Sequence, residues 1–239
     1  MKELSSKNNP LFKHLSKLIA LPSYRYECKT ALISGTILIQ ELSLILPIKT
    51  LLFEQEIFLK AEKSFFCSAA LLKALTKLPS VQGPVAEVPL PPFVNISSKE
   101  RIAILDEIND PGNMGTLIRS AKAFGIDGVH ITKGSCDPFN DKVIRSSKGA
   151  VFSLPISYEP YTELDFSSHR MLLADMKGTS CRKIEPFGPI CVVLSNETSG
   201  LNPKWRGEKV SIPIAKEMES LNVAAAGAIL FYEFSGVQC

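Results

Sequence analysis

The pattern of apolar and polar positions changes its period many times along the chain. Short, largely apolar runs, typical of strands, alternate with stretches in which apolar residues recur every three or four positions, typical of helices. In the first half, the predicted strands are 30–34, 49–54, 63–68 and 84–88, and the predicted helices are one that begins at Pro10 after Asn9 and two at 36–46 and 69–78. This alternation predicts a small α/β unit.

The same alternation continues in the second half. The predicted strands are 101–108, 128–132, 171–176, 191–196 and 209–214, and the predicted helices are 115–124, 140–148 and roughly 221–234. Strands separated by helices favour a mostly parallel sheet that is covered on both faces. Ligands of such sheets bind beyond the carboxyl ends of the strands, so we expect functional residues in the loops that follow them.

A proline-rich segment separates the two halves. The stretch "VPLPPFVNISS" (88–98) carries three prolines. Proline fixes its own φ and holds the preceding residue in extended geometry, which is typical of a stiff linker. We therefore predict two domains, residues 1–95 and 96–239.

Composition predicts a folded, cytoplasmic protein with no membrane partner. Of the 239 residues, 45% are hydrophobic and 21% are charged, which suits a chain that buries a core. The most apolar stretch, 36–53, is interrupted by Gln40, Glu41, Pro47 and Lys49 and is too short to span a bilayer. The opening "MKELSSKNNPLFKH" scatters charge where a signal peptide needs an apolar run.

Cysteine and histidine spacing argues against a metal site. The six cysteines form no C-x-x-C pair, and the three histidines do not cluster with them, whereas zinc sites need such spacing. A disulfide framework is not expected at this length and composition. We expect reduced, mostly buried thiols and no metal.

Charge is unevenly distributed between the halves. Residues 1–90 hold 11 Lys and Arg against 7 Asp and Glu, whereas residues 91–239 hold 16 against 17. A basic first half suits a nucleic-acid partner, but on this evidence alone an ordinary solvated surface explains it better.

Three polar loops follow predicted strands: "NDPGNMG", "NETSGLNP" and "AKEMESLN". Each alone is compatible with an ordinary turn, because Asn, Asp, Pro and Gly are turn residues. The first lies between a strand and a helix, as phosphate-binding loops do, but it matches neither G-x-G-x-x-G nor G-x-x-x-x-G-K-[ST]. A dinucleotide-dependent oxidoreductase is therefore disfavoured.

Taken together and in order, three stretches resemble the motifs of the SpoU (TrmH) branch of the SPOUT methyltransferases: "DPGNMGTLIRSA", "VVLSNETSGLNP" and "VSIPIAKEMESLNVAAAGAILFYE". The resemblance covers residues 101–234. In the first half, "NPLFKHLSKL", "YRYE" and "ALISGTILIQE" resemble the L30e-like RNA-binding domain often found ahead of this domain. The implied fold is a small L30e-like α/β domain followed by an α/β domain with a deep trefoil knot, a rare exception to the rule against knots.

The resemblance also implies an activity. Members of this family transfer a methyl group from S-adenosylmethionine to a ribose 2′-hydroxyl in RNA. The knot forms the cofactor pocket, and the active site lies between the two protomers of a homodimer. By analogy, the L30e-like domain favours rRNA over tRNA as the substrate.

The resemblance places the catalytic residues at Asn113, Arg119, Glu197, Ser220 and Asn222. Arg119 is implied near the 2′-hydroxyl, but an arginine, with a pKa above about 12, does not accept a proton. We predict instead that Arg119 binds the target phosphate and orients the hydroxyl. Glu197 is expected to hold Arg119 or its own loop by charge-assisted hydrogen bonds. Helix capping alone also explains Ser220 and Asn222.

Cofactor contacts are implied largely through backbone groups. They are expected at Leu194, Ser195, Gly200, Ile212, Ile214 and Leu221. Many relatives have glycine where this chain has Ser195 and Thr198, and glycine permits a positive φ and a close ligand approach. This departure leaves open a second class of function, a non-catalytic RNA-binding protein that keeps the fold.

Overall fold

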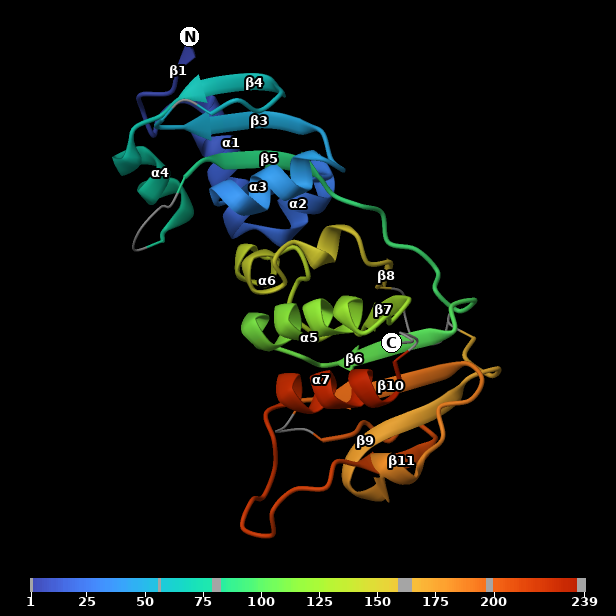
Figure 1. Ribbon diagram of the computed structural model, residues 1–239. Helices are drawn as coiled ribbons and strands as arrows, with labels where there is room; N and C mark the ends of the chain where they lie inside the picture. The colour runs from blue at the N-terminus through green and yellow to red at the C-terminus, as the bar shows by residue number, and fades with distance from the viewer. Residues whose placement is uncertain (1, 56, 79–82, 159–164, 197–199, 236–239) are drawn as a thin grey trace. The chain divides into compact units, whose positions relative to one another are not determined.

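The computed structural model describes residues 2–55, 57–78, 83–158, 165–196 and 200–235 (Figure 1). The chain divides into two compact units, Met1–Pro91 with Phe139–Gly149, and Pro92–Pro138 with Ala150–Cys239. The separate functional domains predicted at 1–95 and 96–239 stay a prediction.

A five-stranded mixed sheet forms the first unit. Its strands follow the order β1-β4-β3-β5-β2, and β5 runs antiparallel to both of its neighbours. The strands are β1 (Lys2–Glu3), β2 (Thr30–Ser34), β3 (Ile48–Phe53), β4 (Ala61–Phe66) and β5 (Val85–Pro89). The helices are α1 (Pro10–Ala20), α2 (Pro22–Cys28), α3 (Thr36–Ser43), α4 (Ala69–Thr76) and α6 (Asp141–Ser146).

Local sequence signals explain most of these elements. Asn9 is the N-cap of α1, as predicted, and its side-chain oxygen accepts a hydrogen bond of 2.9 Å from the Leu11 amide. The predicted helix at 36–46 is too long, because α3 ends at Ser43. Ser43 Oγ there donates to the carbonyl of Gln40, and Leu44 is 85% exposed.

Helix α2 is not predicted by the apolar pattern, for a physical reason. It buries a charged residue, Arg25, which is 1% exposed. The Arg25 guanidinium donates to the carbonyls of Leu18 (2.5 Å) and Ile19 (3.0 Å) in the last turn of α1, where carbonyls have no partner within the helix. A helix that buries a guanidinium shows no apolar stripe in its sequence.

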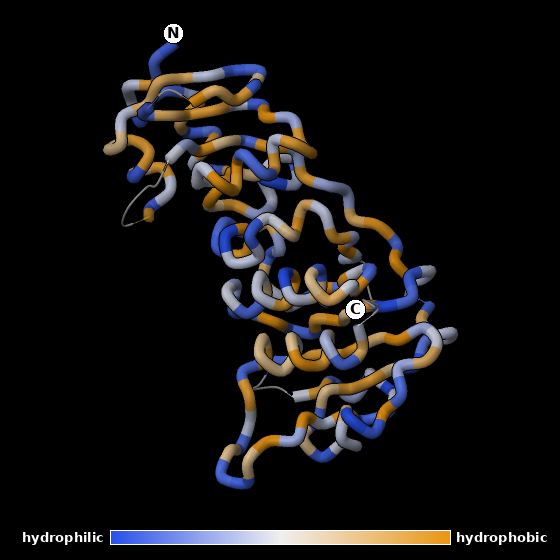
Figure 2. The backbone as a smooth tube through the Cα atoms, viewed as in Figure 1, coloured by the Kyte–Doolittle hydropathy of each residue, from blue (hydrophilic) through white to orange (hydrophobic). Residues whose placement is uncertain are grey.

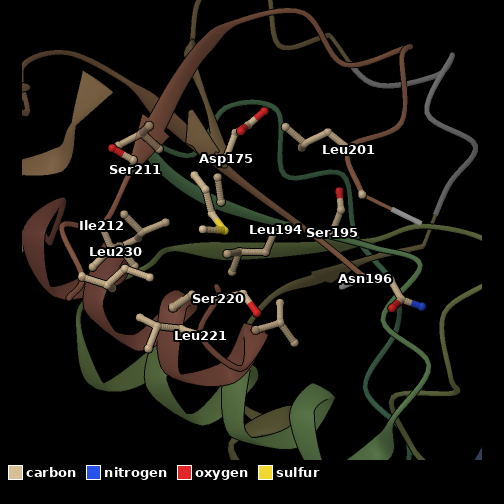
Figure 3. Close-up of a pocket in the computed structure, with 17 residues that line it drawn as sticks. Asp175, Leu194, Ser195, Asn196, Leu201, Ser211, Ile212, Ser220, Leu221 and Leu230 are labelled. Carbon is tan, nitrogen blue, oxygen red and sulfur yellow. The ribbon is translucent and has the colours of Figure 1, made fainter. Parts of the chain in front are cut away.

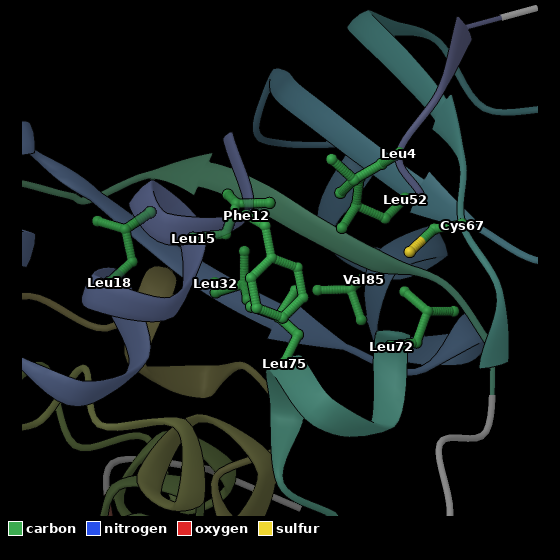
Figure 4. Close-up of a cluster of buried hydrophobic side chains, with 10 residues drawn as sticks. All are labelled: Leu4, Phe12, Leu15, Leu18, Leu32, Leu52, Cys67, Leu72, Leu75 and Val85. Carbon is green, nitrogen blue, oxygen red and sulfur yellow. The ribbon is translucent and has the colours of Figure 1, made fainter. Parts of the chain in front are cut away.

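The first unit has one continuous apolar core, drawn in Figure 4. Its members come from α1, α4, the strands and the segments between them: Leu4, Phe12, Leu15, Leu18, Leu32, Leu52, Cys67, Leu72, Leu75 and Val85. Burial raises the pKa of the Cys67 thiol to about 11, so this cysteine is an apolar packing residue.

A buried polar cluster lies beside this sheet. The carboxylate of Glu87 on β5 is 6% exposed and accepts hydrogen bonds from the hydroxyls of Thr30 and Thr50, both at 2.9 Å. His14 Nε2 lies 3.1 Å from the same carboxylate. Burial alone raises the pKa of Glu87, but hydrogen bonds from His14, Thr50 and Thr30 outweigh burial and hold the pKa below its ordinary value of 4.5.

The second unit contains a six-stranded sheet in which every described pair is parallel, so the predicted α/β class and parallel sheet are confirmed. The strand order is β11-β9-β10-β6-β7-β8. The strands are β6 (Arg101–Asp106), β7 (Gly128–Ile131), β8 (Ile156–Ser157), β9 (Arg170–Ser180), β10 (Ile190–Ser195) and β11 (Glu208–Ser211). Figure 2 shows the central strands as largely hydrophobic, as fully covered parallel strands should be. The trefoil knot stays a prediction.

Three boundaries in this unit differ from the sequence-based expectation by three residues or more. Strand β9 runs to Ser180, four residues beyond the predicted end at 176. Helix α5 (Pro111–Ala123) begins four residues before the predicted 115, so much of the supposed turn "NDPGNMG" is helix. Asp110 is its N-cap and accepts from the Asn113 amide at 2.8 Å, and Pro111 occupies the first turn. Strand β11 ends at Ser211, short of the predicted 214, because Pro213 has no N–H to pair.

Helix α7 (Val223–Glu233) packs against α5 and β10 through a glycine. A Cβ atom at Gly227 would overlap Leu117 on α5 and lie 2.8 Å from Leu194 Cδ1 on β10. Only glycine allows this close approach of the helix to both neighbours.

Among the described residues, no helix is long and apolar enough to cross a membrane. None of the five described cysteines forms a disulfide. In the same part of the chain, no group of three or more His, Cys, Asp or Glu residues is arranged to hold a metal ion.

Candidate functional site

In the second unit, strand β9 separates locally from both of its neighbours, β10 and β11. β9 pairs with β10 as far as Leu173 and Val193, and it pairs with β11 at Leu172–Leu173 and again at Thr179–Ser180. The intervening residues 174–178 have no partner in either neighbouring strand. Gly178 lets this segment pass close to β11, because a Cβ there would overlap the Lys209 backbone.

The separated strands open a cavity of about 340 Å³ near the carboxyl end of β10 (Figure 3). Its walls come from residues 174–176, the end of β10, the loops on both sides of β11, and the start of α7. This is where parallel sheets usually bind ligands. The volume falls in the range of roughly 300–1,000 Å³ that is typical of small-molecule sites.

The structure brings the predicted cofactor positions together in this cavity. All six line it: Leu194, Ser195, Gly200, Ile212, Ile214 and Leu221. Ser220, predicted as catalytic, lines it too. Gly200 has a φ of +65°, a conformation in which glycine is unstrained.

Sequence reasoning missed one whole wall of the cavity. Ala174, Asp175 and Met176 line it from the part of β9 that leaves its neighbours. The sequence "MLLADM" predicts only a strand, and the single signal for a site was an acidic residue inside an otherwise apolar run. Leu201, Ser211 and the α7 residues Ala226 and Leu230 also contribute.

Ser195 fits its position without strain. It is the last residue of β10 and is not among the described non-glycine residues that have a positive φ. Its Oγ donates to Asp106 Oδ2 over 3.4 Å, and Lys204 Nζ lies 3.3 Å from Asp106 Oδ1. Asp106 therefore holds both flanks of the loop after β10. Thr198 lies outside the described residues.

Asn113 and Asn222 are joined directly. Asn222 is the N-cap of α7, and its Oδ1 accepts from the amides of Ala224 (2.9 Å) and Ala225 (3.4 Å). Its Nδ2 donates to Asn113 Oδ1 on the first turn of α5 over 3.1 Å. Asn222 thus caps one helix and fastens it to another.

Arg119 lies apart from the cavity. It is exposed on α5, does not line the pocket, and makes no hydrogen bond or ion pair with the described residues. Glu197, its predicted partner, lies outside the described residues. The structure therefore brings together the predicted cofactor positions and the Asn113–Asn222 pair, and leaves the Arg119 guanidinium facing solvent.

Comparison with known proteins gives this arrangement a context. Residues 100–232 match the model of the SpoU rRNA Methylase family. The chain is 29% identical to 23S rRNA (guanosine(2553)-2'-O)-methyltransferase RlmP of Bacillus subtilis, over 99% of this chain and 100% of that protein.

Two crystal structures with AdoMet are similar along nearly the whole chain. An rRNA methyltransferase from Sinorhizobium meliloti has a TM-score of 0.83 and 25% identity, over 98% of this chain and 97% of that one. The SpoU methyltransferase AviRb from Streptomyces viridochromogenes has a TM-score of 0.84 and 25% identity, over 95% and 97%.

Proposed function

The chain belongs to the SpoU rRNA Methylase family, and we propose that it transfers a methyl group from S-adenosylmethionine to a ribose 2′-hydroxyl of 23S rRNA. One observation carries this proposal: the six residues that the family resemblance assigns to the cofactor all line one cavity. The B. subtilis relative is named as a 23S rRNA 2′-O-methyltransferase. Because Ser195 fits β10 without a positive φ, a non-catalytic RNA-binding role loses part of its support.

The residues that line the cavity suit an adenosyl ligand. Apolar side chains such as Ile212, Leu221 and Leu230 provide surfaces for a flat base, and backbone groups of the loops on both sides of β11 can supply donors and acceptors. When bound, S-adenosylmethionine supplies an activated methyl group on its sulfonium.

The Asn113–Asn222 hydrogen bond connects the wall of the cavity to helix α5, which carries Arg119. Ser220 and Leu221 line the cavity, and Asn222, the next residue, bonds to the first turn of α5. Arg119 lies on that same helix. This linkage holds α5, and with it the guanidinium, in a fixed relation to the cofactor.

Arg119 binds the target phosphate and orients the hydroxyl. A guanidinium is permanently charged and matches the geometry of phosphate oxygens, but it is not a base. Holding the hydroxyl in line with the methyl group lowers the barrier without proton transfer to arginine. The phosphate takes part in removing the proton.

The protein works as a homodimer in this proposal. Helix α7 is apolar on nearly all sides, which is typical of a helix that is buried on all faces, yet Ile229 and Tyr232 are 37% and 63% exposed. A second copy of the chain covers this face, and Arg119, which does not line its own cavity, completes the site of the partner. Because ribosomal RNA is the substrate, we place the enzyme in the cytoplasm.

The first unit binds RNA as an L30e-like domain. Residues 1–90 have an excess of four positive charges, which favours a polyanionic partner. In this proposal the first unit selects the RNA and the second performs the transfer.

The test is methyl transfer itself. Protein-free 23S rRNA is incubated with S-adenosylmethionine that carries a labelled methyl group, with 16S rRNA as the control. The label is expected in 23S rRNA alone, in a dinucleotide that resists alkaline hydrolysis, because a methylated 2′-oxygen cannot attack its phosphate. Cofactor binding without any transfer to rRNA would favour the non-catalytic reading.

A further inference from the structure

Asp175 is the only carboxylate among the described residues that line the cavity. It belongs to residues 174–178, which leave both neighbouring strands, and its side chain is 21% exposed. Figure 3 shows Asp175 on the wall opposite Ser220 and Leu221. In a mainly apolar pocket, a few polar groups fix the orientation of the ligand by hydrogen bonding, and Asp175 is placed to be one of them.

The carboxylate has one protein partner on each oxygen. Asp175 Oδ1 accepts from the Lys177 amide at 2.9 Å, and Lys209 Nζ lies 2.7 Å from Oδ2. The Lys209 ammonium and the Lys177 amide hold the pKa of Asp175 below its ordinary value of 3.8, so it is ionised at neutral pH. An ionised carboxylate has about four acceptor sites, and each oxygen therefore retains capacity for a ligand.

The charge of Asp175 is already matched by Lys209, which does not itself line the cavity. S-adenosylmethionine offers cations, the sulfonium and the α-ammonium, and it offers a neutral pair of ribose hydroxyls. Because Lys209 already neutralises Asp175 at 2.7 Å, a second cation gains little from the acid and is repelled by the lysine. Two hydroxyls need only the remaining acceptor sites and meet no such repulsion.

We propose that Asp175 accepts hydrogen bonds from the 2′- and 3′-hydroxyls of the cofactor's ribose, and so selects adenosyl ligands that keep both hydroxyls. The inference rests on the proposed function, since it names the group that the same pocket recognises. Acid recognition of a ribose hydroxyl is the solution that parallel α/β sheets use for dinucleotides. Here the acid comes from a strand that bulges out of the sheet.

The test is isothermal titration of the full chain with three probes. S-adenosylhomocysteine carries adenine, ribose and amino acid; 5′-methylthioadenosine lacks the amino acid; its 2′-deoxy analogue also lacks one hydroxyl. We expect Asp175→Asn to lower the affinity for S-adenosylhomocysteine and for methylthioadenosine by the same factor, about tenfold or more. The wild-type preference for methylthioadenosine over its deoxy analogue should shrink in the variant.

Lys209→Gln is the matched control. This substitution removes the ion pair between β9 and β11 but keeps the carboxylate. Because the Lys209 side chain is 56% exposed, its loss should change the stability of the fold little. We expect it to bind methylthioadenosine within about threefold of wild type. If Asp175→Asn is destabilised by an unpaired lysine, the double variant Asp175→Asn with Lys209→Gln restores folding and should still bind weakly.

The outcomes separate the alternatives. A loss of affinity for S-adenosylhomocysteine with unchanged methylthioadenosine binding would place the acid at the ammonium and overturn the proposal. Unchanged affinity for both probes would make Asp175 a purely structural residue and also overturn it. If the wild-type protein binds neither probe, the result contradicts the proposed function itself, and with it the proposed role of Asp175.

Discussion

Glu87 and Asp175 are both strand carboxylates, yet the two units use them in opposite ways. Glu87 on β5 is enclosed, and the protein itself supplies its donors: Thr30, Thr50 and His14. Asp175 on β9 has one partner on each oxygen and lines a cavity. The difference teaches that a buried acid saturated by its own protein is structural, whereas one that keeps acceptor capacity beside a cavity is available to a ligand.

The largest expected effect is on methyl transfer, and it comes from Arg119, which makes no hydrogen bond or ion pair with the described residues. Arg119→Ala should lower methyl transfer by about 100-fold or more, because orientation of the target hydroxyl is lost, while thermal stability and cofactor affinity stay unchanged. Lys122→Ala, which removes another exposed charge from α5, is the control. Equal losses in both variants would mean that the helix contributes only general attraction for RNA.

Glu87→Gln should act on stability alone. Removing the charge weakens three hydrogen bonds in a buried cluster, at a cost of about 2 kcal/mol. Trp205, the only tryptophan, is buried in the second unit. Urea unfolding should therefore shift when it is followed by circular dichroism and stay in place when it is followed by Trp205 fluorescence. Equal shifts would show that the two units unfold together and would weaken the contrast.

Gly227→Ala should destabilise the second unit, whereas Glu87→Gln destabilises the first. The added methyl group overlaps Leu117 and crowds Leu194, and overpacking of this kind costs about 1–3 kcal/mol. The Trp205 transition should shift, and cofactor affinity should fall, because Leu194 lines the cavity.

The smallest effect is a dependence on pH. The folded pKa of Glu87 lies below 4.5, so the stability that it adds is present above pH 4.5 and is lost as the pH falls through the lower folded value. Wild type should lose this stability below about pH 4.5 in the circular-dichroism transition, and Glu87→Gln should lose less over the same interval. Parallel curves for the two proteins would remove Glu87 as the source.

Much of this architecture follows from the sequence. The apolar runs predict most of the strands because that signal is local, whereas the residues that line one cavity come from the resemblance of three ordered motifs to a known family. Helix α2 escapes prediction because it buries Arg25 in place of an apolar stripe. The sequence pattern places the start of α5 too late because turn residues also cap helices: Asp110 and Pro111 serve as N-cap and first-turn residue.

The role of Asp175 escapes prediction for another reason. Its position depends on where β9 parts from β10, and that depends on the contact of Gly178 with the Lys209 backbone, about 30 residues further along the chain. An acid between Ala174 and Met176 looks, in sequence, like the solvent side of a strand. Arg119 poses the same difficulty, because its proposed site belongs to a second chain.

The unpaired segment of β9 also makes this pocket a promising scaffold for engineering. Residues 174–178 are flanked on both sides by paired positions, Leu173 and Thr179, so substitutions within the segment can change the shape of one wall while the strand register on either side is kept. Ala174→Gly is a natural first step toward accepting cofactor analogues that carry larger alkyl groups. Such analogues would label RNA at the nucleotide that the enzyme selects.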